Sequence, residues 1–556
     1  MKKTNVLMSV LLVCSFVTAS FAQTPPTYFD DNGAYFGPDY EETEPNYNGA
    51  YYTGIYTSPF KTVLGKTDEE IQDKLDQLWK HYFKGDDNSK VYYDKGSEAY
   101  IKDIANNDVR SEGMAYGMMI CVQTNHKEEF DKLWNWTHHH LWNNPEDGGD
   151  GYFAWHCQPD GSKIDNASAP DAELYMVTSL MFAAHRWNDE SYMEAAQSIL
   201  KKFWEGYYTL FHQQEYVVTF VPQRTRDFSN PSYDLPAFVD LFARWSTTNQ
   251  DKWRTAATNT RNHLFKSSHS TTGLFADYSC YNGQPYSYSS NPNSDKYMYD
   301  AMRCAMNYGM DYYLFGADAS QQEVMAQRII DFFEKDKYKH ARFNWDGSNP
   351  SESYTQGEAG ANAVACFALL GNPDYAESVK KNMELAWNVK PMTGQYRYYD
   401  GLVHYLAMLH LCGSFKIWKP KPTVYEKNIT ADEYNGVKYS EKTIFYSFED
   451  GRLYKVTITP KSNTEPKPAP NPDSKSDPEN PSTPVSSISD TPSVKVWSSN
   501  HTIFIASAPD TKYKIIDLQG RTIATSITKS SLEQIPFAKS GVFVVIINGK
   551  SFKLAL

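Results

Sequence analysis

A glutamate followed by small and apolar residues is the first sign of chemistry in this chain. Glu112 lies in the segment 108–119, where apolar residues follow it at helical spacing. Ser111 and Asp108 are residue types that cap helices, so we expect Glu112 in a first helical turn. An apolar setting raises a carboxyl pKa because the ionised form lacks water. Such a group can donate a proton near neutral pH, although a glutamate there can also serve only the helix dipole.

Three further acids stand at the starts of predicted helices. They are Asp171, Asp234 and Asp300, and Arg303 follows Asp300 by one helical turn. Each acid alone is most simply a helix cap, but together they could line one cleft. Splitting a glycosidic bond needs one protonated and one ionised carboxyl group. Glu112 in apolar surroundings and Asp300 beside an arginine are placed to favour these opposite states.

The elements that must position these acids are predicted to be helical. A capping box at 67–70 opens the first long helix. Helical periodicity then predicts twelve helices, near 68–84, 111–126, 127–141, 170–187, 190–204, 232–248, 250–266, 296–315, 319–335, 357–370, 372–387 and 399–413. Twelve helices in consecutive pairs suggest a toroid with an inner and an outer ring. The long loops between them carry aromatic and acidic residues, as functional loops commonly do.

Composition narrows the class of ligand. The 556 residues carry a net charge of −13, which argues against nucleic acid and anionic membranes as partners. Aromatic residues make up 15% of the chain. Tyrosine and tryptophan combine a flat apolar face with a polar edge, which suits sugar rings as well as ordinary interfaces.

The cysteines and histidines do not predict a metal site. Apart from Cys14, the cysteines are scattered singly, at Cys121, Cys157, Cys280, Cys304, Cys366 and Cys412. The sequence contains no C-x-x-C pair, so a zinc cluster is not expected. Most of these cysteines are expected to be buried thiols. The run 138–140 is three histidines, but consecutive helical residues point in different directions, so we interpret it as a solvated helix end. We expect neither a metal nor a cofactor.

The ends of the chain differ from its helical middle. Lys2 and Lys3 precede an apolar run at 6–17, and the small-residue segment 19–22 offers a cleavage site. This pattern is typical of an export signal, so we expect a secreted or cell-surface protein, with a periplasmic location as the alternative. The predicted organisation is a signal peptide at 1–22, an arm at 23–66, the helical domain at 67–420, a β-type extension at 421–460, a proline-rich linker at 461–492 and a small β-sandwich at 493–556.

A series of motifs in the helical region resembles glycoside hydrolase family 8. They are RSEGMAYGMM at 110–119, WNW at 134–136, GYFAWHCQPDG at 151–161, APD at 169–171, HRW at 185–187, PSY at 231–233, DAMR at 300–303, RYYD at 397–400 and GSFKIW at 413–418. The resemblance implies an (α/α)6 barrel and hydrolysis of β-1,4 glycans with inversion, without a cofactor.

The resemblance also implies roles for individual residues. Glu112 would be the general acid and Asp300 the general base, with their carboxyl groups roughly 6.5–9.5 Å apart to admit water. Asp171 would bind and distort the sugar at the cleavage point. The remaining candidates are Tyr233 and Arg303, which would position the water and the base, and Trp155 and Tyr399, which could be sugar platforms or core residues; Asp234 would be structural.

Within the family, FAW at 153–155 and APDAELY at 169–175 look like xylan-active members. One related class releases xylose from the reducing end of xylo-oligosaccharides and carries a Leu-His-Pro segment, from which SYTQG at 353–357 departs. We therefore expect an endo-acting, monomeric xylanase on xylan or xylo-oligosaccharides, with the exo-oligoxylanase as alternative. A non-catalytic glycan-binding surface protein and a polysaccharide lyase are further alternatives.

The C-terminal segment has its own resemblance. YKIIDLQGR at 513–521 and GVFVV at 541–545 look like the sorting domains of the type IX secretion route of Bacteroidetes. This would make the secretion machinery a partner of the chain. A carbohydrate-binding module is the alternative for this segment.

Overall fold

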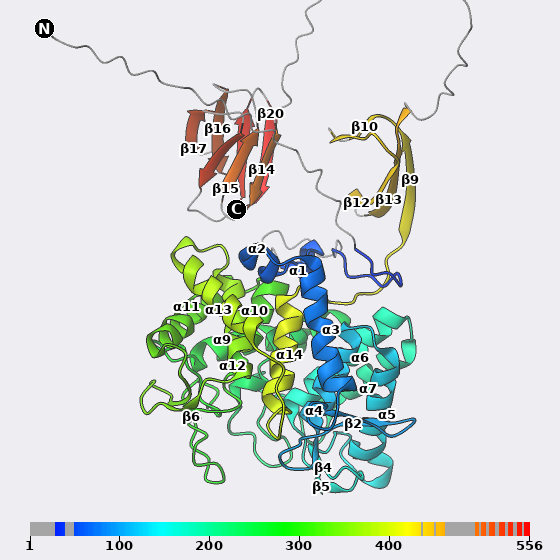
Figure 1. Ribbon diagram of the computed structural model, residues 1–556, viewed down its shortest axis with the longest axis vertical. Helices are drawn as coiled ribbons and strands as arrows, with labels where there is room; N and C mark the ends of the chain where they lie inside the picture. Colours follow the sequence, from blue (N-terminus) through cyan, green and yellow to red (C-terminus); the bar gives the residue numbers. More distant parts are fainter. Residues whose placement is uncertain are drawn as a thin grey trace, which may run out of the picture. The chain divides into compact units, whose positions relative to one another are not determined.

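The computed structural model describes most of the helical domain and the strands that follow it (Figure 1). The described residues are 28–38, 49–434, 437–449, 452–461, 495–499, 502–506, 511–517, 522–528, 532–536, 542–547 and 550–555. The predicted signal peptide at 1–22 and nearly all of the predicted linker at 461–492 lie outside them.

The twelve predicted helices are all present. In the described part of the chain, the helices of ten residues or more are α3 (Asp68–Lys84), α4 (Ser111–Gln123), α5 (Lys127–Trp136), α6 (Pro170–Trp187), α7 (Glu190–Glu205), α8 (Pro236–Trp245), α9 (Gln250–Ser267), α10 (Arg303–Leu314), α11 (Ala319–Asp336), α12 (Gln356–Ala365), α13 (Ala376–Asn388) and α14 (Tyr399–Leu411). Two short helices, α1 (Ala50–Thr53) and α2 (Pro59–Leu64), precede them. The predicted mainly α fold is confirmed.

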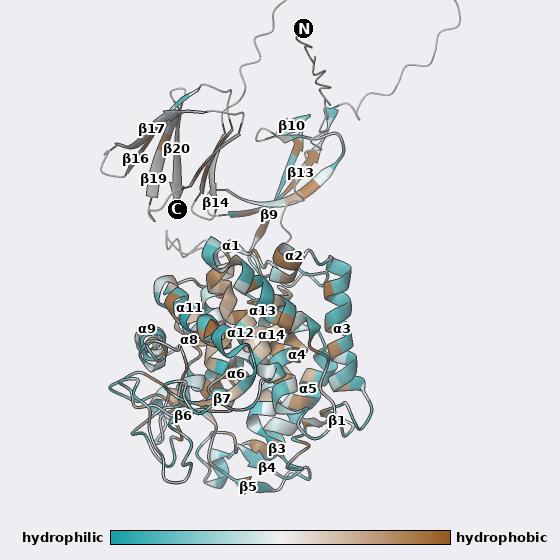
Figure 2. Cartoon of the chain, turned by 60° about the vertical axis from the view of Figure 1, so that its left-hand side comes forward, coloured by the Kyte–Doolittle hydropathy of each residue, from teal (hydrophilic) through white to brown (hydrophobic). Residues whose placement is uncertain are grey.

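These helices form two rings. The even-numbered helices contact one another in the order α4, α6, α8, α10, α12 and α14, and α14 contacts α4 again, which closes an inner ring. The inner helices are buried almost all round; every residue of α4 except Glu112 is buried. Odd-numbered helices such as α3 bury one stripe only, and Figure 2 shows α3 as largely hydrophilic with separate apolar patches. This is the arrangement expected of a helical barrel.

Two inner helices begin later than the sequence pattern predicted. Residues 296–315 were expected to be one helix, but Lys296–Tyr297 form strand β6, and α10 begins only at Arg303. Pairing with strand β7 (His340–Asn344) holds this segment extended. In addition, the Ala301 N–H donates a hydrogen bond to the carboxylate of Asp277. Likewise the helix expected at 232–248 begins at Pro236, after the 3-10 turn η3 (Pro231–Tyr233).

Small sheets lie at the end of the barrel where the inner helices begin. One sheet joins β3 (Val109–Arg110), β4 (His156–Cys157) and β5 (Lys163–Asp165). Another joins β6, β7 and β8 (Ser351–Ser353). Figure 1 shows β4, β5 and β6 at this end of the helical unit. β3 leads directly into α4, and β6 lies just before α10, so each sheet supports the start of an inner helix.

The described residues at 423–461 belong to a second compact unit, which begins where the helical part of the chain ends, at Pro422. The strands beyond it are β9 (Val424–Thr430), β10 (Glu433–Tyr434), β11 (Val437–Lys438), β12 (Thr443–Glu449) and β13 (Arg452–Thr459), followed by β14 (Lys495–Ser499), β15 (Thr502–Ala506), β16 (Lys512–Asp517), β17 (Thr522–Ile527), β18 (Leu532–Pro536), β19 (Val542–Ile547) and β20 (Lys550–Ala555). β14–β20 form two sheets, in the orders β14-β15-β18 and β17-β16-β19-β20.

The cysteines can be compared with the expectation that most of them are buried thiols. In the described ranges, all six cysteines are free, and five of them are buried, including Cys121 and Cys304. Among the helices that the structure describes, none has the length and apolar character needed to cross a membrane.

Candidate active site

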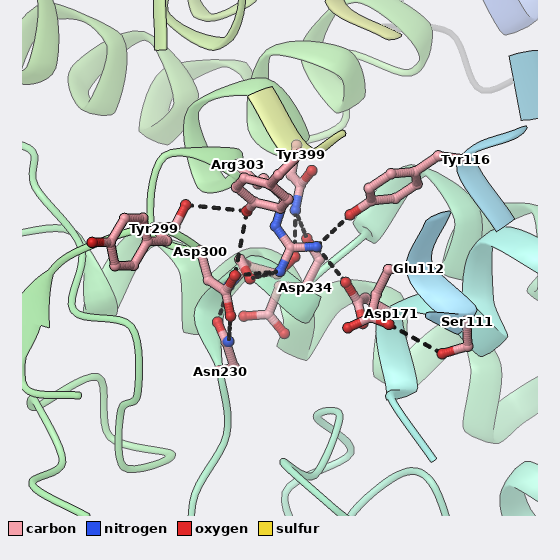
Figure 3. A network of polar contacts seen from close by, with 12 residues as sticks. Ser111, Glu112, Tyr116, Asp171, Asn230, Asp234, Tyr299, Asp300, Arg303 and Tyr399 are labelled. Atoms are coloured by element: carbon pink, nitrogen blue, oxygen red, sulfur yellow. Dashed lines mark hydrogen bonds and ion pairs between the residues drawn. The ribbon is translucent and has the colours of Figure 1, made fainter. Parts of the chain in front are cut away.

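The starts of the inner helices bring the sequence-predicted acids together (Figure 3). Glu112 is the second residue of α4, and Asp171 is the second residue of α6. Arg303 and Tyr399 are the first residues of α10 and α14. Asp300 lies in the turn before α10. Hydrogen bonds and ion pairs link most of these side chains in one network, so the site is built where the ring of inner helices begins.

Glu112 has the setting of a proton donor. Its side chain is half-buried, and the structure gives it one side-chain hydrogen bond, from Ser111 Oγ at 3.2 Å. Burial and the negative charge of Asp171 raise the pKa of Glu112 to about 7, against the opposing effects of its own backbone N–H and the nearby Arg110 and Arg303. The carboxyl group is therefore partly protonated at neutral pH, as the apolar sequence context predicted.

The expected helix caps are wrong. Asp108 and Ser111 do not cap α4; the N-cap position is Arg110, which has no capping hydrogen bond. The chain enters the helix from strand β3, and the Ser111 N–H bonds to the carbonyl of Trp155 at 3.0 Å, so no side-chain cap is needed there. Asp108 instead accepts hydrogen bonds from Arg110 Nε at 3.2 Å and from His156 Nε2 at 2.7 Å.

Asp300 is surrounded by donors. Oδ2 accepts a hydrogen bond from Asn230 Nδ2 at 3.0 Å, and Oδ1 accepts one from the Tyr399 hydroxyl at 3.3 Å. Arg303 Nη2 lies 3.4 Å from Oδ1. The side chain of Asp300 is still 35% exposed, so water can reach it. These donors fix the orientation of the Asp300 side chain, and a carboxyl group within reach of water has the position that a general base requires.

Arg303 joins the two sides of the site. It is buried, and Nη1 donates to Asp171 Oδ2 and to the Tyr116 hydroxyl, while Nη2 donates to Ser232 Oγ at 2.8 Å. The other carboxylate oxygen of Asp171, Oδ1, has no hydrogen-bond partner among the described residues. Burial raises the pKa of Asp171, although Arg303 opposes this. A buried acceptor without a partner is unusual, and such groups commonly have a catalytic role or bind an ordered water.

The three aromatic candidates lie around this network. Tyr233 ends η3, and the Arg303 guanidinium lies 5.9 Å from its ring centre. Trp155 is half-buried, and its ring stacks on His156 with ring centres 4.6 Å apart. The Tyr399 hydroxyl reaches the carbonyl of Tyr299 at 3.1 Å as well as Asp300, so its polar end supports the turn that carries Asp300.

Comparison with known proteins identifies the family. Residues 92–411, more than half of the chain, match the profile of Glycosyl hydrolases family 8. The chain belongs to glycosyl hydrolase family 8. The helical-barrel fold and the expected enzyme class, an inverting glycoside hydrolase, are therefore confirmed. Family membership also favours a hydrolase over the non-catalytic glycan-binding and lyase alternatives.

Similar members of the family include xylan-active proteins. The reducing end xylose-releasing exo-oligoxylanase of Halalkalibacterium halodurans is 36% identical over 388 residues, covering 67% of this chain and 97% of that protein. A protein of the same description from Bifidobacterium adolescentis is 32% identical, covering 63% of this chain and 94% of its own. A xylanase from Teredinibacter turnerae, solved as a catalytic mutant with xylohexaose, has a TM-score of 0.63 at 36% identity, covering 67% of this chain and 100% of that chain.

One sequence candidate stands apart in this family 8 site. Asp234 Oδ2 pairs with His263 Nδ1 at 2.5 Å, and both side chains are buried. The carbonyl of Asp234 also accepts a hydrogen bond from Asn307 at 3.0 Å. These contacts fit the structural role expected for Asp234.

Several residues of the family 8 site were not predicted from the sequence. Tyr116 follows Glu112 by one helical turn, so its place on the same face could have been anticipated. Asn230 precedes the PSY motif, where it caps the turn through Ser232 N–H at 2.9 Å. Asp277 gave no local signal. Burial and the charge of Asp300 raise the pKa of Asp277 well above its usual range. Its Oδ1 accepts a hydrogen bond from the Ala301 N–H at 3.1 Å.

Proposed function

We propose that this chain hydrolyses β-1,4-xylosidic bonds of xylan or xylo-oligosaccharides with inversion. The observation that carries the proposal is the contrast between the two carboxyl groups of one site, Glu112 with a raised pKa and Asp300 held by donors. The xylan-active descriptions of the similar family members support the substrate class.

The proposed reaction is a single displacement. Glu112 donates its proton to the glycosidic oxygen as the bond to the anomeric carbon breaks. Asp300 accepts a proton from a water molecule, whose oxygen forms the new bond to that carbon from the opposite face. Glu112 ends ionised and Asp300 protonated, so proton exchange with solvent must restore both before the next turnover.

The surrounding residues are proposed to bind and orient. The unpartnered Oδ1 of Asp171 is available for a sugar hydroxyl. Arg303 fixes the other oxygen of Asp171 and lies beside Asp300, which keeps the two carboxylates in one geometry. Tyr233 beside Arg303 would help to position the water. Trp155 would provide a sugar platform, while Tyr399 combines a ring face with a hydroxyl that contacts the base.

Endo cleavage is our first candidate for the mode of action. The segment 353–357 departs from the Leu-His-Pro pattern of the reducing-end enzymes, and it passes from the exposed strand β8 into α12. A cleft without that closing segment would accept chain on both sides of the cleaved bond. The similar Teredinibacter turnerae xylanase, solved with xylohexaose, is consistent with this mode.

Reducing-end exo cleavage is the second candidate. It is favoured by the descriptions of the relatives from Halalkalibacterium halodurans and Bifidobacterium adolescentis, both named reducing end xylose-releasing exo-oligoxylanases. Both modes use the same two carboxyl groups. They differ only in which sugar can occupy the site beyond the cleaved bond.

Product analysis on xylohexaose separates the two modes and tests the reaction. The endo mode predicts xylobiose, xylotriose and xylotetraose among the first products, whereas steady release of xylose alone would support the exo mode instead. Proton NMR of the first-formed product should show the α-anomer. The β-anomer would contradict the proposed inversion, and unsaturated products absorbing in the ultraviolet would contradict hydrolysis altogether.

We also propose that the chain is exported. The support is the leader-like segment 1–22 and the resemblance of 493–556 to sorting domains, which we propose fold as a β-sandwich. In a bacterium with type IX secretion machinery, we expect the mature chain outside the cells, beginning at Gln23.

A truncated chain tests the sorting role of the C-terminal segment. Removing 493–556 should retain the protein in the cells; unchanged secretion would contradict a sorting role. Binding of 493–556 to insoluble xylan would support the carbohydrate-binding alternative.

A further inference from the structure

Outside the active site, two histidines and a glutamate converge near the β1–β2 hairpin. Strand β1 (Tyr92–Asp94) pairs with β2 (Ala99–Ile101), and Glu98 lies in the hairpin just before β2. Its Oε1 lies 2.8 Å from His139 Nδ1, and its Oε2 lies 3.2 Å from His140 Nε2. The potential ligand atoms of these three described residues all lie within 4.8 Å of one another.

The backbone explains why two neighbouring histidines can point the same way. The run 138–140 was interpreted as a solvated helix end because consecutive α-helical residues diverge. However, α5 is followed by a π-helical turn, η1 (Thr137–Leu141). A π turn contains more residues than an α turn, so neighbouring side chains diverge less. The rings of His139 and His140 are 4.3 Å apart at 31°, and both face Glu98. Such turns are frequent at functional sites.

The donor set and its spacing suit a transition-metal ion. Imidazole favours Zn²⁺, Cu²⁺ and Ni²⁺, and a carboxylate oxygen is a regular zinc ligand. Two ligands at zinc distances of about 2.0–2.1 Å in a tetrahedral site lie about 3.3 Å from each other. The contacts of His139 with Oε1 and of His140 with Oε2 of Glu98, at 2.8 and 3.2 Å, are hydrogen-bonding distances near that value. All the potential ligand atoms lie within 4.8 Å of one another, so small side-chain shifts would place them around one ion.

The protein also holds His140 in a fixed orientation. Its ring packs on Trp136, with ring centres 4.8 Å apart. On its Nδ1 side it lies against Gly161, where an added Cβ would come within 2.0 Å of the ring nitrogen. Gly161 has a φ of +89°, so a glycine is favoured there on both grounds. With Nδ1 covered by this loop, Nε2 is the atom directed at Glu98.

We propose that Glu98, His139 and His140 bind one divalent transition-metal ion, of which Zn²⁺ is the representative. The ion ties the β1–β2 hairpin to the π turn at the end of α5. From there the carbonyl of Leu141 accepts the Ala154 N–H at 2.8 Å, and the carbonyl of Trp155 accepts the Ser111 N–H at 3.0 Å. The site therefore stabilises the segment that leads to Glu112, without taking part in the reaction.

Metal titration of the full chain, produced without a polyhistidine tag, tests this site. Co²⁺ should bind with a stoichiometry of one and give the visible absorption bands of a bound cobalt ion, and Zn²⁺ should displace it. Glu98→Gln and His139→Ala should weaken binding by more than about 100-fold, because even residues outside the ligand shell contribute about 10–100-fold. His139 is 70% exposed, so its removal should leave the fold intact.

The adjacent histidine provides a matched control. His138 belongs to the same π turn, but its ring contacts Trp134 and Trp142 rather than Glu98. His138→Ala should keep full cobalt binding and the rise in Tm that Zn²⁺ produces in the unmodified chain. His139→Ala should lose both. The proposal is overturned if the unmodified chain binds no cobalt, if His139→Ala and Glu98→Gln bind as tightly as it does, or if His138→Ala loses binding equally.

Discussion

The two sides of the active site treat the same chemical group in opposite ways. On the α4 side, Glu112 receives one hydrogen bond from a neighbouring serine, and burial raises its pKa to about 7. On the α10 side, Asp300 receives hydrogen bonds from Asn230 and Tyr399 and lies beside Arg303. Both residues are carboxylic acids near the start of an inner helix. In the proposed reaction, their different neighbours, rather than their residue type, make Glu112 the proton donor and Asp300 the proton acceptor.

The two carboxyl groups also differ in how far away in the sequence their hydrogen-bond donors lie. Among the described residues, the side-chain donor to Glu112 is Ser111, its neighbour in sequence, while the charge of Asp171 from α6 adds to the rise in its pKa. The donors around Asp300 come from the residue before η3 and from α10 and α14, which are far apart in the chain. An ionised carboxylate needs several fixed donors, and only the closed ring of helices brings them to one point.

Replacing Asp300 should have the largest effect. Asp300→Asn keeps the shape of the side chain but cannot accept a proton from water, so we expect kcat on xylo-oligosaccharides to fall by about 10³-fold or more, at the upper part of the range for general base catalysis. Glu352→Gln is the matched control. Glu352 is exposed and bonds to the Tyr299 hydroxyl at 2.9 Å beside the base, so its change should alter kcat by no more than about two-fold. Near-normal activity of Asp300→Asn would contradict its role.

Replacing Glu112 should have a large effect that depends on the substrate. Glu112→Gln removes the proton donor, so we expect a loss of about 10²–10⁴-fold on xylo-oligosaccharides. In an aryl xylobioside with an acidic phenol, the phenolate leaves without protonation. The variant should therefore retain much more activity on that substrate. In the unmodified chain, kcat/KM should fall as pH rises above about 7, because the acid is then ionised. An equal loss on both substrates would contradict the assignment of Glu112 as the acid.

Removing a single donor from Asp300 should have the smallest effect. Tyr399→Phe keeps the ring but removes the hydroxyl that reaches Asp300 at 3.3 Å. One hydrogen bond contributes about 1 kcal/mol, so kcat should fall by about five-fold while KM changes little. An unchanged kcat would show that Tyr399 acts only through its ring, as a sugar platform. The kcat and KM of Trp155→Phe provide the comparison, because Trp155 is a proposed sugar platform and the structure shows no hydrogen bond between it and Asp300.

The helices could be predicted from sequence because their signal is local. Periodicity placed α3 and α6 with their observed ends, and the apolar residues after Glu112 predicted its raised pKa. The late start of α10 could not be predicted, because strand pairing with β7 and the carboxylate of Asp277 hold residues that precede it.

The rest of the site depends on contacts that the sequence does not display. Asn230 and Asp277 are distant from Asp300 in sequence and meet it only through the fold. The π turn at 137–141 carries no sequence pattern that distinguishes it from the end of α5. The separation of the two catalytic candidates, roughly 6.5–9.5 Å for inversion, stays a prediction.

A carboxyl titration tests the central claim, that Glu112 holds a proton near neutral pH, most directly. In the chain labelled with ¹³C at glutamate carboxyl groups, NMR should show a signal that titrates near pH 7 and is absent from Glu112→Gln. The variant is needed for assignment because burial also raises the pKa of Glu173 and of Glu358. A Glu112 signal titrating near its ordinary value of 4.5 would contradict the account, because no proton would then be held for the leaving group at neutral pH.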